Sequence, residues 1–265
     1  MSTSETAHRR RRAIPLTGRG FGVDIGGSGI KGAPVDLAEG RFLAERLRIP
    51  TPSPSTPGAV ADTLAELVRE FGDAAGDRQI GVTFPAVIQH GVARTAANVD
   101  RSWIDTDVDA LFTAVLGRAV HVMNDADAAG FAEARFGAAR DVDGVVIVCT
   151  LGTGIGSALL VDGELVPNTE LGHLEIDGHD AEKRAADSAR DRESLSWEAW
   201  AARLERYFGV VESLFWPDLF VVGGGVSKKG DKFLPLLTLR TPIVAAQLRN
   251  DAGIIGAATL AAEEG

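Results

Sequence analysis

The chain has 265 residues, of which 45% are hydrophobic, 24% are charged and 31 are glycine, so a disordered or fibrous protein is excluded. The net charge of −10 argues against a protein that binds duplex nucleic acid. The single cysteine, Cys149, excludes an intrachain disulfide and a cysteine-rich zinc site. Because the sequence shows no membrane-spanning apolar run and no signal-peptide core, we expect a soluble, cytoplasmic protein.

The first half of the chain predicts a meander followed by alternating helices and strands. Residues 1–18 are polar and contain Arg9 to Arg12, which we interpret as a disordered tail rather than an anion-binding arm. Strands are expected over 21–25, 30–36 and 42–49, with the glycine turn 26–29 between the first two. We then expect a helix over 59–71, a strand over 79–83, a helix over 109–116 and a strand over 120–123.

The second half repeats this order more loosely. An apolar strand over 145–149 runs into a glycine turn and is followed by strands over 155–162 and 164–166, a helix over 195–215, a strand over 219–222 and a helix that starts near 254. Two such halves predict duplicated α/β domains that face each other across a cleft. We place these domains at 19–123 and 124–252, with the C-terminal helix 253–264 as a candidate addition to the first.

Three glycine-rich motifs are candidate phosphate sites: VDIGGSGIKG (23–32), CTLGTGIGSALL (149–160) and FVVGGGVSKK (220–229). Without a Cβ, glycine lets successive backbone N–H groups approach an anion. The residues assigned to phosphate or nucleotide binding are Asp24, Gly26, Gly27, Ser28, Lys31, Thr150, Gly152, Thr153, Gly154, Gly223, Gly224, Gly225, Lys228 and Lys229. Asp24 is also the candidate to hold Mg²⁺ through water, whereas the alternative for each motif is a plain tight turn.

A fourth motif, VMNDADAAGFAEARFG (122–137), places Asn124 and Asp125 where a strand ends and a helix begins. Asp125 is either the N-cap of that helix or a carboxylate at the mouth of the cleft that accepts a proton from a substrate hydroxyl. We expect Asp127, Glu133 and Arg135 on the surface of the helix.

A fifth motif, TELGHLEIDG (169–178), holds Glu170 and His173 three residues apart. A carboxylate and an imidazole this close suit hydrogen bonding to the vicinal hydroxyls of a sugar. The alternative is a salt bridge within a loop.

Taken together and in this order, the five motifs resemble the ROK family of sugar kinases, from Gly20 to about Ala262. The stretches TFPAVIQHGVARTAANVDRSW, NDADAAG and ELGHLEIDGHDAEKRA are similar to those of the actinobacterial polyphosphate glucokinases within that family. The resemblance implies an α/β protein with the actin-like ATPase (ribonuclease H-like) fold, in which two similar domains flank a cleft. It also implies a homodimer.

The resemblance further implies a reaction and a set of roles. Asp125 would orient and deprotonate the 6-hydroxyl of glucose, and the glycine turns would cradle polyphosphate or ATP with Mg²⁺. The residues implied to bind the sugar are Asn98, Asn124, Asp125, Glu170, His173 and Glu182. Kinases for mannose, fructose or N-acetylmannosamine, and a non-catalytic sugar sensor of the same fold, are the alternatives.

Two features of the family are missing from this sequence. Many members carry cysteines after the Gly-His pair that bind a structural zinc with that histidine, but no cysteine follows His173. We therefore expect no structural zinc, and His173 is left for the sugar. Only 19 residues precede the first strand, too few for the helix-turn-helix of the family's repressors, so we expect no nucleic-acid partner. We also expect no membrane partner, because no apolar run approaches the length of a membrane span.

A polyphosphate donor needs a local positive track on an acidic protein. One candidate is the lysine segment after the three-glycine turn, Lys228, Lys229 and Lys232. The other is the mixed-charge segment that contains Lys183, Arg184, Arg190 and Arg192.

Overall fold

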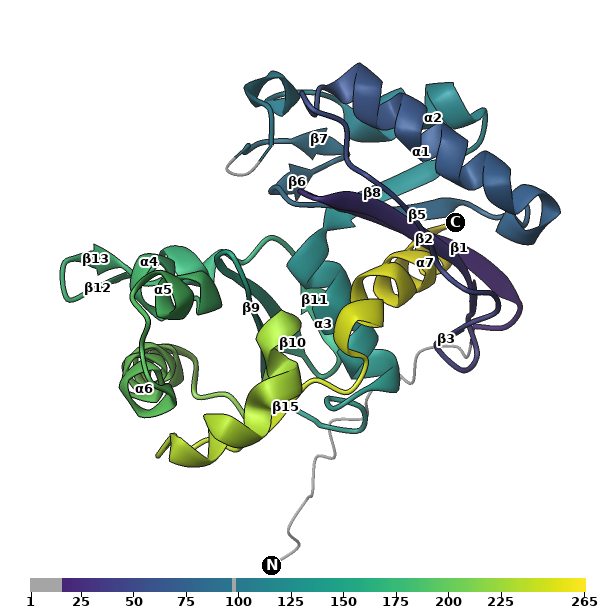
Figure 1. Ribbon diagram of the computed structural model, residues 1–265. Helices are drawn as coiled ribbons and strands as arrows, with labels where there is room; N and C mark the ends of the chain where they lie inside the picture. Colours follow the sequence, from purple (N-terminus) through teal and green to yellow (C-terminus); the bar gives the residue numbers. More distant parts are fainter. Residues whose placement is uncertain (1–15, 97–98) are drawn as a thin grey trace, which may run out of the picture.

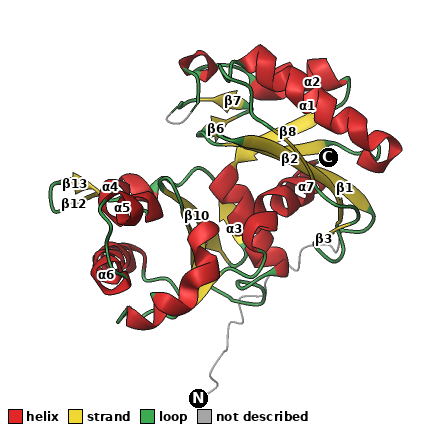
Figure 2. Cartoon of the chain, in the orientation of Figure 1, coloured by secondary structure: helices red, strands yellow, loops and turns green. Residues whose placement is uncertain are grey.

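Two β-sheets with the same internal order form the framework of the computed structural model, which describes residues 16–96 and 99–265 (Figures 1 and 2). The first sheet has the order β3-β2-β1-β5-β8, with β4 also paired to β2, and the second has the order β11-β10-β9-β14-β15. In both, an antiparallel meander is extended by parallel strands beyond its first strand. The predicted duplication of the α/β arrangement is confirmed.

The strands of the first sheet are β1 (Arg19–Gly26), β2 (Gly29–Asp36), β3 (Arg41–Phe42), β4 (Leu47–Ile49), β5 (Ile80–Phe84) and β8 (Val120–Asn124). Those of the second sheet are β9 (Val145–Leu151), β10 (Ile155–Val161), β11 (Glu164–Val166), β14 (Leu219–Gly223) and β15 (Ile243–Ala245). Two small hairpins consist of β6 (Ile88–Gln89) with β7 (Val92–Ala93), and β12 (Glu175–Ile176) with β13 (His179–Asp180).

The α-helices are α1 (Pro57–Phe71), α2 (Val108–Leu116), α3 (Asp125–Phe136), α4 (Glu182–Ala185), α5 (Asp187–Arg192), α6 (Trp197–Phe215) and α7 (Ala252–Glu264). The 3₁₀ helices are η1 (Gly72–Ala75), η2 (Arg101–Trp103), η3 (Leu171–His173), η4 (Gly225–Lys232), η5 (Leu234–Leu236) and η6 (Arg249–Asp251). Within the described ranges, no helix combines the length and the apolar character that a membrane span requires.

The helices and sheets alternate in layers, as Figure 1 shows. Helices α1 and α2 cover one face of the first sheet, and α7 packs on β1 and β5 from the other side. Helix α3 lies between α7 and the second sheet, whose far face is covered by α6. The division of these layers into domains at 19–123 and 124–252 stays a prediction.

Two expectations about local structure are wrong. The single strand expected over 42–49 is two short strands, because the intervening segment leaves the sheet and carries Arg46 to an ion pair with Asp251 at 3.0 Å. Asp127 and Glu133 are 2% and 1% exposed rather than on a helix surface, because α3 is covered on both sides. Arg135 is also largely covered, at 18% exposure, and pairs with Glu263 at 3.1 Å.

Helix α7 packs against its neighbours backbone to backbone. Real Cβ atoms essentially never approach another heavy atom more closely than 3.0 Å. A Cβ atom added to Gly22 of β1, Gly81 of β5 or Gly256 of α7 would lie much closer than this to a neighbouring group. The groups in the way are backbone carbonyls of α7, for the first two, and of α3 at Ala128, for Gly256. Glycine at these three positions therefore sets how closely the first sheet, α7 and α3 approach one another.

We predict that Gly256→Ala destabilises the protein by about 1–3 kcal/mol, because the methyl group has no space against the Ala128 carbonyl. Gly209→Ala, in the middle of α6 with nothing within 4 Å of the added carbon, is the matched control. It should stabilise the protein by about 0.5–1 kcal/mol, as alanine does in a helix interior. Denaturant unfolding measures both, and equal effects of the two substitutions would contradict the packing argument.

Candidate active site

A cavity of about 310 Å³ brings the glycine-rich motifs together with Asp125. Among its lining residues are the predicted Asp24, Lys31, Asp125, Thr150, Gly223 and Gly224. It also contains Arg46, Arg249 and Asn250, which the sequence did not indicate. With Glu133, which also lines it, the cavity combines three carboxylates with three cationic side chains.

Strand register places the polar groups around Asp24. Lys31 lies opposite Asp24 in the antiparallel pair β1–β2, and Thr83 lies opposite it in the parallel pair β1–β5. Lys31 Nζ donates to Asp24 Oδ2 at 3.0 Å, and Thr83 Oγ1 donates to Oδ1 at 2.9 Å. Because a carboxylate has about four acceptor sites, Asp24 keeps acceptor capacity toward the cavity.

Asn124, not Asp125, is the N-cap of α3. Asn124 Oδ1 accepts hydrogen bonds from the N–H groups of Ala126 at 2.8 Å and Asp127 at 3.2 Å, and its Nδ2 donates to the Ala86 carbonyl at 3.1 Å. The alternative that Asp125 is the N-cap is therefore wrong, because the preceding residue, Asn124, occupies that position. The amide of Asn124 retains one N–H for a ligand.

Asp125 is exposed at the wall of the cavity, yet protein groups crowd it from the remaining sides. This desolvation, together with the negative charges of Asp24 and Glu170, raises the pKa of Asp125 to about 6. The N–H of Ala126, which donates to Oδ1 at 2.9 Å, opposes the shift. The carboxyl group is thus poised to exchange a proton near neutral pH.

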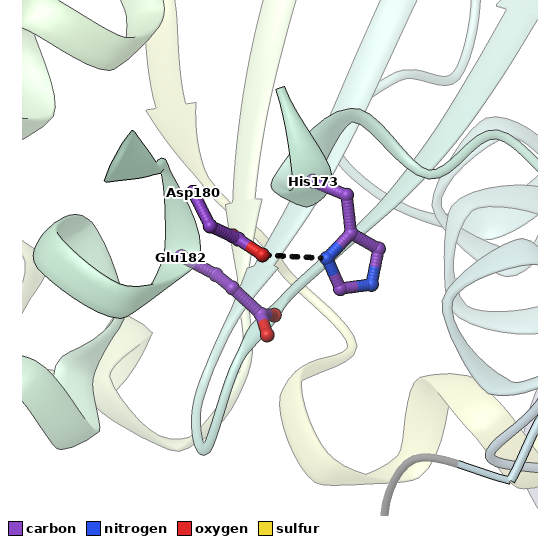
Figure 3. A group of neighbouring side chains, drawn as sticks. All are labelled: His173, Asp180 and Glu182. Atoms are coloured by element: carbon purple, nitrogen blue, oxygen red, sulfur yellow. Dashed lines mark hydrogen bonds and ion pairs between the residues drawn. The ribbon is translucent and has the colours of Figure 1, made fainter. Parts of the chain in front are cut away.

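Beside Asp125 lies a second group of predicted residues, Glu170, His173 and Glu182. Figure 3 shows two of them, His173 and Glu182, together with Asp180. His173 Nε2 is 3.9 Å from Glu170 Oε2, and Glu182 Oε2 accepts a hydrogen bond from the N–H of Ile155 at 3.1 Å. Polar atoms of His173, Glu182 and Asp180 lie within 4.8 Å of one another. Asp180, which no motif indicated, thus joins this group, while Asn98 lies outside the described residues.

The buried Asp127 anchors the loop that carries Glu170. Its Oδ2 accepts a hydrogen bond from the N–H of Asn168 at 2.7 Å, and burial raises the pKa of Asp127 to about 7. The side-chain amide of Asn168 in turn accepts from the N–H of Ile88 at 2.9 Å and donates to its carbonyl at 2.7 Å. This pairing connects the segment before Glu170 to the first half of the chain.

The glycine turns occupy different places relative to the cavity. Gly223 and Gly224 line it, and the positive φ of Gly224 (81°) brings the end of β14 against the Leu151 carbonyl. The residues that close the two glycine hairpins do not line the cavity; they are Gly26, Gly27, Ser28, Gly152, Thr153 and Gly154. Gly225, which follows Gly224, does not line it either. Ser188, at the start of α5, donates to the carbonyls of Gly152 and Thr153, so α5 begins directly at the second hairpin turn.

The two predicted positive segments meet at Trp197. Lys229 Nζ and Lys232 Nζ lie 6.0 and 5.7 Å from the centre of the ring, and Arg190 Cζ lies 4.3 Å from it. Asp187 and Asp191 hold Arg190 through ion pairs at 3.0 and 2.6 Å. We call Lys229, Lys232, Arg190 and Trp197 the Trp197 cluster; no contact places Lys228, which is exposed on η4, within it.

Comparisons with known proteins identify relatives of this chain. The profile of the ROK family matches residues 20–188. The polyphosphate glucokinase of Mycobacterium tuberculosis is 51% identical over 240 residues, which cover 90% of this chain and 89% of that protein. The polyphosphate glucokinase of Mycobacterium leprae is 52% identical over 241 residues, which cover 91% of this chain and 74% of that protein. The crystal structure of inorganic polyphosphate/ATP-glucomannokinase from Arthrobacter sp. strain KM superposes with a TM-score of 0.90 at 58% identity, covering 94% of this chain and 100% of that chain.

We predict that Asp24→Asn lowers the pKa of Asp125 from about 6, because the substitution removes a like charge from the cavity. Carbon-13 NMR titration of the Asp125 carboxyl group measures this directly. Thr83→Val, which removes a hydrogen bond from Asp24 but no charge, is the control and should leave the titration of Asp125 near its original position. An unchanged pKa in Asp24→Asn would contradict the electrostatic coupling of the two carboxylates.

Proposed function

This chain belongs to the ROK family, and we propose that it is a glucokinase that transfers a phosphoryl group from inorganic polyphosphate or ATP to the 6-hydroxyl of glucose. The observation that carries the proposal is the position of Asp125: it lines a cavity that also contains Lys31, Arg46 and Arg249, and it lies close enough to Glu170 for their charges to interact. The fold, two sheets of equal order separated by α3 and α7, is the actin-like ATPase fold. The homodimer stays a prediction.

We assign sugar binding to the group beside Asp125. Glu170, His173 and Glu182 present carboxylate and imidazole groups that match the donors and acceptors of vicinal sugar hydroxyls. The remaining N–H of Asn124 supplies a further donor. Glucose held in this way directs its 6-hydroxyl toward Asp125.

Asp125 acts as the general base in this mechanism. Above about pH 6 its carboxylate is ionised and accepts the proton of the 6-hydroxyl as the oxygen attacks the terminal phosphorus. A new bond forms between the 6-oxygen and phosphorus, and the bond from phosphorus to the bridging oxygen of the donor breaks. Positioning and charge neutralisation supply most of the acceleration in such a transfer.

The cavity neutralises the charge of the phosphoryl donor. Lys31, Arg46 and Arg249 supply positive charge at its wall, and the backbone at Gly223 and Gly224 permits a close approach. The acceptor capacity left on Asp24 fits a divalent cation, because Mg²⁺ binds oxygen ligands and usually takes only one or two carboxylates from the protein. When bound there, Mg²⁺ supplies additional charge neutralisation for the transferred group.

We assign the distal part of a polyphosphate chain to the Trp197 cluster. Helix η4 starts at Gly225, next to the cavity-lining Gly224, and carries Lys229 and Lys232 to Trp197. Helix α5 starts at the second hairpin turn and carries Arg190 to the same ring. A long polyphosphate would extend along these cations, whereas ATP has only three phosphates.

We also propose mannose as a second acceptor, because the Arthrobacter protein with 58% identity is named a glucomannokinase. Mannose differs from glucose only in the configuration at carbon 2, so its 6-hydroxyl reaches the same carboxylate. The test is to incubate the protein with mannose and each donor, and to measure ADP when ATP is the donor or the sugar phosphate ester with either donor. The absence of any product would reject the proposal.

We predict that Asp125→Asn lowers kcat for glucose phosphorylation by about 10²-fold or more, because the amide accepts no proton. A coupled assay for glucose 6-phosphate with each donor measures the loss. Glucose affinity and the unfolding midpoint should change little, since Asn124 rather than Asp125 caps the helix. In the wild type, kcat/KM for glucose should fall as the pH drops below about 6, when Asp125 becomes protonated.

Turnover of Asp125→Asn close to that of the wild type would reject the assignment of the base. Wild-type protein that binds glucose but forms no phosphate ester with either donor would favour the sugar-sensor alternative.

We predict that the double substitution of Lys229 and Lys232 by alanine raises KM for long polyphosphate. It should also make KM less dependent on salt, lowering the slope of log KM against log salt concentration by roughly 1 to 2. KM for ATP should change less. Steady-state kinetics at several salt concentrations measure this, with Arg140→Ala, an exposed arginine elsewhere on the surface, as the control. Equal effects on both donors would place these lysines at the common reaction centre, and no effect would reject the track.

A further inference from the structure

The imidazole of His173 has carboxylate groups next to both ring nitrogens. Its Nδ1 is 3.2 Å from Asp180 Oδ2, and its Nε2 is 3.9 Å from Glu170 Oε2. Figure 3 shows the side chains of Asp180 and His173 pointing toward one another, with the Glu182 carboxylate beside them. The contact joins two separate elements, because His173 ends η3 whereas Asp180 lies in the hairpin formed by β12 and β13.

The other contacts of Asp180 are weak. Its Oδ1 is buried and makes no hydrogen bond with any of the described residues, and Lys183 Nζ lies 3.9 Å from Oδ2. A buried acceptor without a partner is costly to the folded state. The hydrogen bond to His173 is therefore the principal polar interaction of a carboxylate that is otherwise poorly satisfied.

This contact fixes how the imidazole is used. The two ring nitrogens are chemically distinct, and the hydrogen bond made by one determines which proton state the other presents. Asp180 accepts the Nδ1–H, because a carboxylate has no proton to donate. The Nε2 atom is consequently left on the side of Glu170, where a sugar hydroxyl would bind.

We propose that Asp180 is a positioning residue for the sugar: by accepting the Nδ1–H of His173, it holds the ring so that Nε2 meets the hydroxyl that Glu170 also binds. This inference rests on the proposed function, because it takes His173 as a sugar ligand. It assigns a role to a residue that no sequence motif indicated.

The charges around His173 agree with this arrangement. Burial by itself would lower the pKa of His173, but the hydrogen bond to Asp180 and the charges of Glu182, Asp180 and Glu170 outweigh burial and raise it. Lys183, which faces Asp180, is a further charged group next to the pair. Removing the charge of Asp180 therefore lowers the pKa of His173, even if the ring stays in place.

The test compares Asp180→Asn with Asp177→Asn. Asp180→Asn keeps the size of the side chain and a carbonyl acceptor but removes the charge. Asp177→Asn is the same substitution in the same hairpin, where Asp177 pairs with Arg206 at 2.7 Å instead of with His173. Asp180→Ala, which removes the acceptor altogether, is the second variant. Unfolding midpoints show whether each variant is folded.

Two readouts are measured: the pKa of His173 in the free protein by NMR, and the steady-state constants for glucose. In Asp180→Asn the pKa of His173 should fall, while KM for glucose should change little, because the amide oxygen still accepts the Nδ1–H. Asp180→Ala removes the acceptor and should raise KM about two- to tenfold, the loss expected for one hydrogen bond, with kcat nearly unchanged. Asp177→Asn should change neither quantity.

Three outcomes would overturn the proposal: an unchanged pKa of His173 in Asp180→Asn, an unchanged KM in Asp180→Ala, or an equal rise in KM in Asp177→Asn and Asp180→Ala. The NMR titration needs no glucose and no catalysis. A wild-type protein that forms no glucose 6-phosphate would therefore contradict the proposed function itself, while the contact between Asp180 and His173 would still be measured.

Discussion

The backbone contacts of α7 are the constraint on which the site depends. Gly22 and Gly81 let α7 lie directly on the first sheet, and Gly256 lets it lie directly on α3. Because Asp24 is part of β1 and Asp125 begins α3, the separation of the two carboxylates follows from this packing. The first turn of α7 also supplies Ala252 and Gly253 to the cavity. A helix at the end of the chain thus aligns groups that come from its first half.

Helix α3 extends the same arrangement at its other end. The buried carboxylate of Glu133 accepts hydrogen bonds from the N–H groups of Ala138 at 2.7 Å, Gln247 at 3.1 Å and Leu248 at 2.7 Å. These donors stabilise a charge that would otherwise be expensive to bury. They also fix the segment from which Arg249 reaches the cavity. One helix therefore presents the proposed base at its first residue and, near its last, secures the segment of Arg249, which we propose neutralises phosphate charge.

The sequence predicted the parts of the structure that local rules determine. Glycine hairpins between apolar strands, a strand-to-helix junction at Asp125, and Glu170 with His173 three residues apart are all visible over short windows. Contacts between distant segments were not predictable: Arg46 pairs with a residue 205 positions away, and Glu133 bonds a backbone N–H 115 positions away. The burial of Asp127 and the role of Asp180 also depend on which loops meet, because neither residue belongs to a pattern that specifies a partner.

The most direct test of the central claim is a crystal structure of the protein with glucose bound. The account predicts that the 6-hydroxyl lies within about 2.6–3.2 Å of the Asp125 carboxylate, with other hydroxyls of the sugar on Glu170 and on Nε2 of His173. Glucose bound with its 6-hydroxyl away from Asp125, or outside the group formed by Glu170, His173 and Glu182, would contradict it.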